Sequence, residues 1–176
     1  MKSHDLLSLA GAGLIVALAG GCAAAPSQRN IPLGPVDTGP GTLEAARNFL
    51  HGEWTLLSLE IFPPDQPSIR AAATGTMTFD DYSNMTVDLQ LSPETARIAD
   101  RLDIPTKDGL LETTGRTVID INSKSISYVL EGQESFRPPR GPLDVNRPRY
   151  WDIKGNTVTL RTKDATGRVL SVAVWE

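Results

Sequence analysis

From residue 52 onward, apolar and polar residues alternate along short segments, which is the period of a β-strand with one buried face. These segments lie at 53–61, 74–79, 85–91, 117–121, 125–130, 149–153, 157–162 and 169–175. Turn-forming Asp, Asn, Ser and Gly residues separate several neighbouring segments by gaps of hairpin length. We therefore predict an all-β fold, an eight-stranded antiparallel up-and-down barrel, because closing the sheet removes both exposed edges.

Two short helical patterns accompany the strands. Residues 43–50 follow Thr42, a suitable N-cap, and Gly52 lies just past their end. Residues 92–102 begin with Ser-Pro-Glu, which favours a helix start, and they carry one apolar face. We expect the second helix to pack on the barrel, with a lid over its opening as the alternative.

A long loop is predicted at 132–148, between the fifth and sixth strands, because this stretch holds four prolines. Basic residues outnumber acidic residues between Glu131 and Arg149. Two interpretations are open. The loop is either an entrance flap, with Phe136, that meets anionic ligands or phospholipid head groups, or a solvated loop whose arginines pair with nearby acids.

The first 21 residues have the pattern of a signal peptide. Lys2 gives a weakly positive start, and residues 6–20 carry no charge. This run is shorter than the roughly 20 residues that a membrane-spanning helix needs. It ends in Leu-Ala-Gly-Gly-Cys at 18–22, which resembles a bacterial lipobox. The resemblance implies cleavage before Cys22 and lipidation of that residue; a plain secretory signal or an uncleaved anchor is the alternative.

The mature chain is predicted to have two parts. Residues 22–42 are rich in Pro and Gly and are expected to be a lipid-anchored flexible linker, followed by the barrel domain at 43–176. Through its lipid the protein would contact the cell-envelope membrane. The resemblance to bacterial lipoproteins implies that Ala23, where an Asp would signal inner-membrane retention, favours the outer membrane facing the periplasm if the source is Gram-negative.

Composition excludes several classes of function. A net charge of −4 leaves no basic excess for a nucleic-acid partner. A single Cys excludes an internal disulfide framework and a Cys-based zinc site. After cleavage His51 is the sole histidine, and it is expected at a helix end, so we predict that the protein is not an enzyme. We also expect a monomer without cofactor or metal. The acidic run 80–84 is interpreted as a turn, with a Ca²⁺ site as the alternative.

The start of the first strand carries a recognisable motif. Gly52-Glu53-Trp54 follows a short helix and resembles the Gly-x-Trp signature of lipocalins and related calycins, and 50–60 is similar to the opening of bacterial lipocalin-like domains. Further short similarities lie at 75–79 with Met85, at 149–151, at Leu160 and at Trp175. The resemblance implies a barrel closed at one end by Gly52 and Trp54, with an arginine over the indole; Arg161 or Arg168 would have to supply it.

Strand parity predicts the lining of this barrel. If Trp54 points inward, then Leu56, Ser58 and Glu60 share its face. The other residues expected to face the interior are Met77, Phe79, Met85, Val87, Leu89, Ile119, Ile121, Tyr128 and Leu130. Of these we assign ligand binding to Leu56, Ser58, Glu60, Met77, Phe79, Met85, Val87 and Tyr128. Glu60 is either a polar anchor for a ligand head group, or a rim residue or internal ion pair.

Two functions follow from this pattern. The barrel carries a small hydrophobic or amphipathic ligand at the cell envelope, as the mostly apolar lining suggests. Alternatively, its interior is filled and the domain is a structural or protein-interaction module of an envelope assembly. Eight strands enclose a space that suits either a packed core or one small ligand, so the volume of the interior decides between them.

Overall fold

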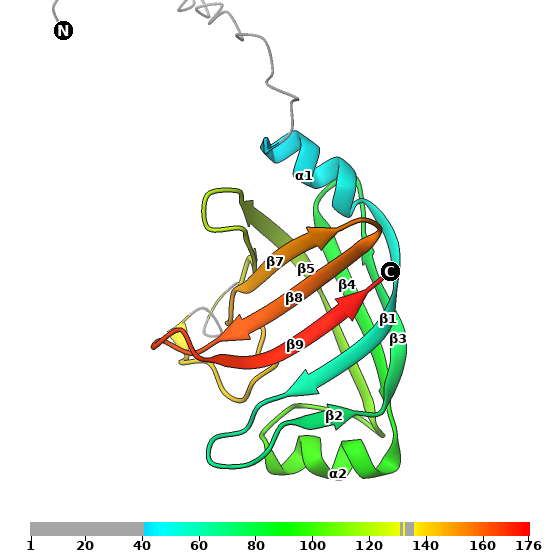
Figure 1. The fold of residues 1–176 in the computed structure, drawn as a ribbon, viewed down its shortest axis with the longest axis vertical. Helices are drawn as coiled ribbons and strands as arrows, with labels where there is room; N and C mark the ends of the chain where they lie inside the picture. The colour runs from blue at the N-terminus through cyan, green and yellow to red at the C-terminus, as the bar shows by residue number, and fades with distance from the viewer. Residues whose placement is uncertain (1–40, 131, 133–135) are drawn as a thin grey trace, which may run out of the picture. The chain divides into compact units, whose positions relative to one another are not determined.

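The computed structural model describes residues 41–130, 132 and 136–176. Its strands follow one another around an antiparallel sheet that closes through pairing of the first strand with the last (Figure 1). This confirms the predicted up-and-down barrel. The elements are α1 (Leu43–Leu50), β1 (Gly52–Ile61), β2 (Ile69–Ala71), β3 (Ala73–Phe79), β4 (Asn84–Leu91), α2 (Pro93–Arg101), β5 (Leu110–Asp120), β6 (Ser125–Tyr128), β7 (Arg149–Lys154), β8 (Thr157–Lys163) and β9 (Val169–Trp175).

The barrel has eight positions, because β2 and β3 lie in line along β1. Residues 52–55 of β1 pair with β3, and residues 59–61 pair with β2. Ala72 interrupts the line: its N–H donates to Thr95 Oγ1 at 3.0 Å, and its carbonyl accepts from the Ser92 N–H at 2.8 Å. The start of α2 therefore replaces the strand partner at this point.

Both predicted helices are present, at opposite ends of the barrel (Figure 1). Thr42 caps α1, its Oγ1 accepting from the Ala45 N–H, and Ser92 caps α2 in the same way with the Thr95 N–H. His51 is the C-cap of α1, as expected. The local capping chemistry thus fixes where each helix begins.

A β-bulge in β1 changes which residues face inward. The pairing with β9 shifts between Leu56 and Ser58, so Leu57 is an extra residue, and its side chain is 50% exposed. Beyond the bulge, Leu59 and Ile61 are buried. The expectation that Ser58 and Glu60 share the face of Trp54 is wrong, because one extra residue reverses the parity of every position after it.

The fifth strand is longer than its sequence pattern indicates. It begins at Leu110 rather than at residue 117, and its pairing with β4 runs from Asn84 to Gln90. Gly115 obscures the alternation because it has no side chain. A Cβ at this position would lie 2.9 Å from the ring of Tyr128, so the glycine makes room for the tyrosine ring. β6 in turn ends at Tyr128 instead of residue 130.

Candidate functional site: the barrel interior and its plug

The end of the barrel next to α1 is closed by an indole. Trp54 is 8% exposed, its Nε1 donates to the Leu50 carbonyl at 2.8 Å, and its ring lies 5.4 Å from the ring of Phe49. Gly52 has φ +116°, a conformation that L side chains rarely adopt, and it turns the chain from helix into strand. The Gly-x-Trp motif, the end of α1 and the closed end of the barrel therefore form one structural unit.

Neither proposed arginine covers this indole. Arg161 lies on the outer face of β8, because its neighbours Leu160 and Thr162 are buried on the inner face. It is opposite Tyr150 of β7. Arg168 directly precedes β9, and it pairs with Asp164 at 3.1 Å. Phe49 of α1 packs against Trp54, and the sequence could not assign it because it precedes the barrel.

Most of the residues predicted to line the barrel do form its core. The side chains of Leu56, Met77, Phe79, Met85 and Tyr128 are buried. Val87 packs partly buried against them. Ser58 and Glu60 do not join them: both are half-buried on the other face of β1, where Glu60 lies opposite Arg70 of β2. No ligand head group inside the barrel would therefore meet the Glu60 carboxylate.

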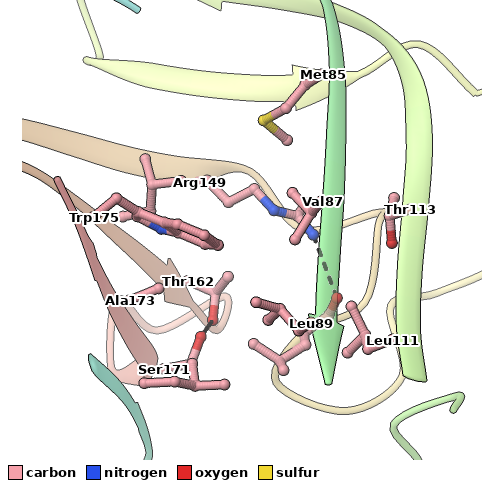
Figure 2. Close-up of a pocket in the computed structure, with 13 residues that line it drawn as sticks. Met85, Val87, Leu89, Leu111, Thr113, Arg149, Thr162, Ser171, Ala173 and Trp175 are labelled. Carbon is pink, nitrogen blue, oxygen red and sulfur yellow. Dashed lines mark hydrogen bonds between the residues drawn. The ribbon is translucent and has the colours of Figure 1, made fainter. Parts of the chain in front are cut away.

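The space left inside the barrel is small. A cavity of about 60 Å³ remains, and Met85 and Val87 are the two predicted ligand-binding residues that line it. Its wall is mostly apolar, with Leu89, Leu111 and Trp175 among its residues (Figure 2). The polar side is made by Arg149 together with Thr162 and Ser171, whose hydroxyl oxygens lie 2.6 Å apart. A site for a drug-sized molecule typically needs roughly 300–1,000 Å³, whereas about 10–15 Å³ suffices for one water.

The segment 137–148 closes the other end of the barrel, and we call it the plug. Pro142 is buried, and Leu143 and Val145 pack against the core. Thr162 Oγ1 on β8 donates to the Pro142 carbonyl at 2.7 Å. The side chains that fill the opening thus come from the loop itself.

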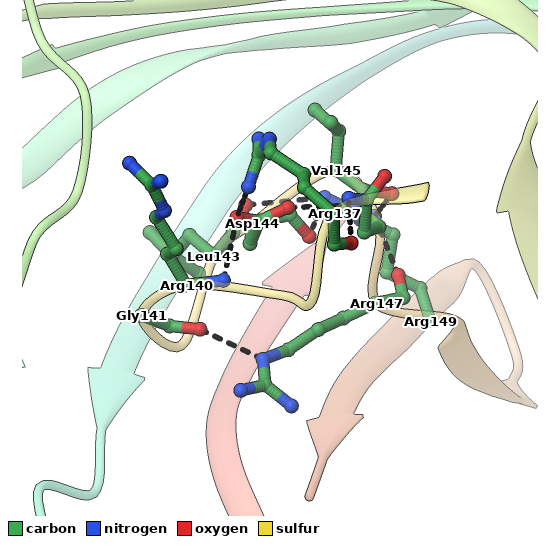
Figure 3. A network of polar contacts seen from close by, with 9 residues as sticks. Arg137, Arg140, Gly141, Leu143, Asp144, Val145, Arg147 and Arg149 are labelled. Carbon is green, nitrogen blue, oxygen red and sulfur yellow. Dashed lines mark hydrogen bonds and ion pairs between the residues drawn. The ribbon is translucent and has the colours of Figure 1, made fainter. Parts of the chain in front are cut away.

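Arg149, the first residue of β7, holds the plug from inside the barrel (Figure 3). Its Nη1 donates to the carbonyls of Arg147 at 2.7 Å and Val145 at 3.3 Å. Its Nη2 donates to Leu143 at 3.3 Å and Asp144 at 3.4 Å. Its guanidinium carbon also lies 5.0 Å from the centre of the Tyr128 ring. One side chain therefore bonds to four backbone carbonyls of the plug, of which that of Asp144 also accepts from the Arg147 N–H.

Asp144 organises the plug from within. Its Oδ2 accepts from Arg137 Nη1 at 2.6 Å and from the Arg140 N–H at 2.7 Å, and its Oδ1 accepts from the Asn146 N–H at 2.8 Å. Burial raises the pKa of this carboxyl, but these hydrogen bonds and the Arg137 charge outweigh burial and hold the pKa below its usual range. The pairing of Arg137 with Asp144 agrees with the interpretation of a loop whose arginines pair with nearby acids.

Burial shifts the pKa values of two groups inside the barrel, Tyr128 and Arg149. Burial raises the pKa of Tyr128 to about 12, against the opposing influence of the Arg149 charge. Burial lowers the pKa of Arg149, while Tyr128 and Asp144 act in the opposite direction. Within the described part of the chain, Tyr128 Oη and the indole Nε1 atoms of Trp151 and Trp175 are buried without a hydrogen-bond partner.

A surface site with catalytic residue types lies beside α1. His51 Nε2 is 3.0 Å from Asp81 Oδ1, and Ser83 lines the same shallow pocket. Sequence reasoning missed this proximity because the three residues come from a helix end and a separate hairpin. No hydrogen bond joins Ser83 Oγ to His51 among residues 41–130, so a nucleophile activated by a base is not assembled there.

The acidic run 80–84 forms a turn, as interpreted. Asp80 Oδ1 accepts from the N–H groups of Tyr82 and Asn84, both at 2.8 Å, and Oδ2 accepts from Asn84 Nδ2 at 2.7 Å. Within the described ranges, no group of three or more His, Cys, Asp or Glu side chains is placed to hold a metal ion. The carboxylate oxygens of Asp80 are thus engaged in the hairpin.

The predicted signal peptide, Cys22 and all but the last two residues of the predicted linker lie outside the described residues. In the part of the chain that is described, no helix has both the length and the apolar character required to cross a membrane. No protein-family model matches the sequence, and no curated protein matches it.

Proposed function

We propose that this chain is a non-enzymatic lipoprotein of the cell envelope that acts through the outer surface of a filled, lipocalin-like barrel. The predicted lipid on Cys22 tethers it to a membrane, on the periplasmic face of the outer membrane in a Gram-negative cell. The barrel then serves as a compact scaffold in an envelope assembly. The observation that carries the proposal is the cavity of about 60 Å³.

Two features of the interior support this function over ligand carriage. The core side chains from β1, β3, β4 and β6 occupy most of the space that a ligand would need. The opening is occupied by the plug, which Arg149 holds through four carbonyls. A ligand of ordinary size would have to displace both, and the free energy of the lost contacts would count against binding.

Uptake of apolar probes by the unlipidated chain, residues 23–176, tests the proposal. We expect neither a fluorescent fatty-acid analogue nor benzene to bind the natural sequence. Leu111→Ala is the positive control, because Leu111 lines the cavity and its truncation enlarges an apolar space, which typically admits benzene-sized molecules. Stoichiometric binding of the fatty-acid analogue to the natural sequence would overturn the proposal.

Carriage of a small apolar or amphipathic ligand is the second candidate. It is favoured by the Trp175 indole N–H, which is buried without a partner on a residue that lines the cavity, and by the Arg149 guanidinium in the same wall. Apolar walls with a few converging polar groups are typical of ligand sites. The same assay separates the candidates, since a carrier would bind the analogue and release it only on competition.

A further inference from the structure

A basic face surrounds the plug on the outside of the barrel. We use this name for Arg137, Arg140, Arg147, Arg161, Lys163 and Arg168. Four of them, Arg140, Arg147, Arg161 and Lys163, make no ion pair with any described residue. The chain as a whole has a net charge of −4, so this concentration of cations runs against its composition.

Contacts other than ion pairs hold two of these cations, Arg147 and Lys163. Arg147 Nε donates to the Gly141 carbonyl at 2.7 Å and its Nη1 donates to the Lys163 carbonyl at 3.3 Å, which joins the plug to β8. Lys163 Nζ lies 4.5 Å above the ring of Tyr150. The guanidinium of Arg140 points away from the polar network of the plug (Figure 3). Arg147 and Lys163 are therefore held in place beside the plug without an ion pair, and Arg140 projects from the same segment.

The acids near this face do not cancel it. Asp144 is buried and paired with Arg137, and Asp164 is paired with Arg168. Two further acids lie close by: Asp103, which follows α2 and has its backbone near Gly141, and Asp152 of β7, two residues along from Tyr150, which is opposite Arg161. These four acids face six cations. The surface charge next to the plug consequently remains positive.

An exposed aromatic residue adjoins the basic face. Phe136 is 88% exposed and directly precedes Arg137. A lone aromatic beside clustered Lys and Arg residues is typical of proteins that rest on membranes, where the ring enters the interfacial region and the cations meet anionic head groups. A protein interface usually surrounds an aromatic ring with further apolar side chains, whereas the residues of the basic face are all cations.

We propose that the basic face docks the domain on an anionic phospholipid surface, with the Phe136 ring inserted among the head groups. The proposal deepens the function proposed above, because a lipid tether at Cys22 would hold the barrel near such a surface at high effective concentration. Docking would orient the domain on the membrane. It does not itself require the tether, so the two are testable apart.

Binding of unlipidated residues 23–176 to vesicles tests the docking. We expect cosedimentation with phosphatidylcholine vesicles that contain phosphatidylglycerol, weakening as salt rises, and none with phosphatidylcholine alone. Arg140→Gln with Lys163→Gln should weaken binding about 25-fold, roughly fivefold for each cation. Lys124→Gln with Lys154→Gln is the matched control: both lysines are exposed and lie at the α1 end, and this variant should bind nearly as the natural sequence does.

Phe136→Ser separates insertion from charge attraction. It should weaken vesicle binding while leaving its salt dependence unchanged. Equal losses in the two double variants, binding to phosphatidylcholine alone, or binding to soluble polyglutamate but not to the anionic vesicles would each overturn the proposal. Probe uptake by the barrel is measured separately, so a failure of the filled-barrel function is distinguishable from a failure of docking.

Discussion

Replacing Arg149 with Met tests whether one side chain holds the plug. Methionine keeps much of the apolar stem but removes all donors to the carbonyls of Leu143, Asp144, Val145 and Arg147. The carbonyls of Leu143, Val145 and Arg147 would need water at the barrel opening or would stay unsatisfied, whereas that of Asp144 keeps the Arg147 N–H. The plug should therefore open locally before the barrel unfolds.

The expected loss follows from the contacts. The bond of 2.7 Å to the Arg147 carbonyl is short and charge-assisted, and such bonds contribute about 1.5–3 kcal/mol. The three bonds of 3.3–3.4 Å and the contact with the Tyr128 ring add smaller amounts. Relief of the desolvation of a buried cation offsets part of this sum. We expect a net loss of about 3 kcal/mol, or a fall in Tm of about 10 °C for a domain of this size.

Hydrogen exchange read by mass spectrometry localises the effect. In Arg149→Met the amides of Arg140, Asn146 and Arg147, which bond to Asp144, should exchange faster, while those of β3 and β4 keep their protection. Arg147→Met is the control. It removes a bond of 2.7 Å and one of 3.3 Å, but from outside the barrel, where water can replace the lost donors, so it should cost less, about 1 kcal/mol. Equal losses of stability in the two variants, or unchanged exchange in the plug of Arg149→Met, would refute the reasoning.

Three further predictions concern the barrel itself. Gly75→Ala would place a Cβ 1.9 Å from the Asp88 carbonyl oxygen, so it should disrupt the β3–β4 pairing and lower the free energy of unfolding by about 3 kcal/mol or more. Gly155→Ala, in open space at φ +58°, should lower it by about 1 kcal/mol, and urea unfolding measures both. Trp54→Phe should lower the urea midpoint by an amount equivalent to about 1–2 kcal/mol, with an unchanged m-value, because the helix carbonyl loses its indole donor. Tyr128 should ionise near pH 12, as followed by tyrosinate absorbance. Since its pKa is raised on folding, stability should be full below about pH 10 and fall as the pH rises towards 12.

Local chemistry made the fold predictable. Alternation gave most strands, and Thr42 and Ser92 marked both helix starts, because capping depends on a few neighbouring residues. The start of β5 was not predicted, because Gly115 interrupts the alternation. A glycine is needed there because the ring of Tyr128, from the neighbouring strand β6, occupies the space of a side chain. Strand existence is thus encoded locally, whereas strand length also depends on neighbours.

The candidate site was only partly predictable. Inward positions on β3 and β4 are correct, but Ser58 and Glu60 are not, because the extra residue Leu57 leaves no mark in an alternating sequence. The volume of the interior depends on how the plug residues enter it. The arginines of the loop could be recognised in the sequence by their charge. Their hydrogen-bond acceptors could not, because most of them are backbone carbonyls that come close only when the barrel has folded.

The mass of the intact protein isolated from its own cell envelope, measured by native mass spectrometry, tests the filled barrel most directly. We predict the mass of the polypeptide from Cys22 with its acyl chains and nothing further, before and after unfolding. A small molecule present in stoichiometric amount on the folded protein, and released when the barrel unfolds, would contradict the account.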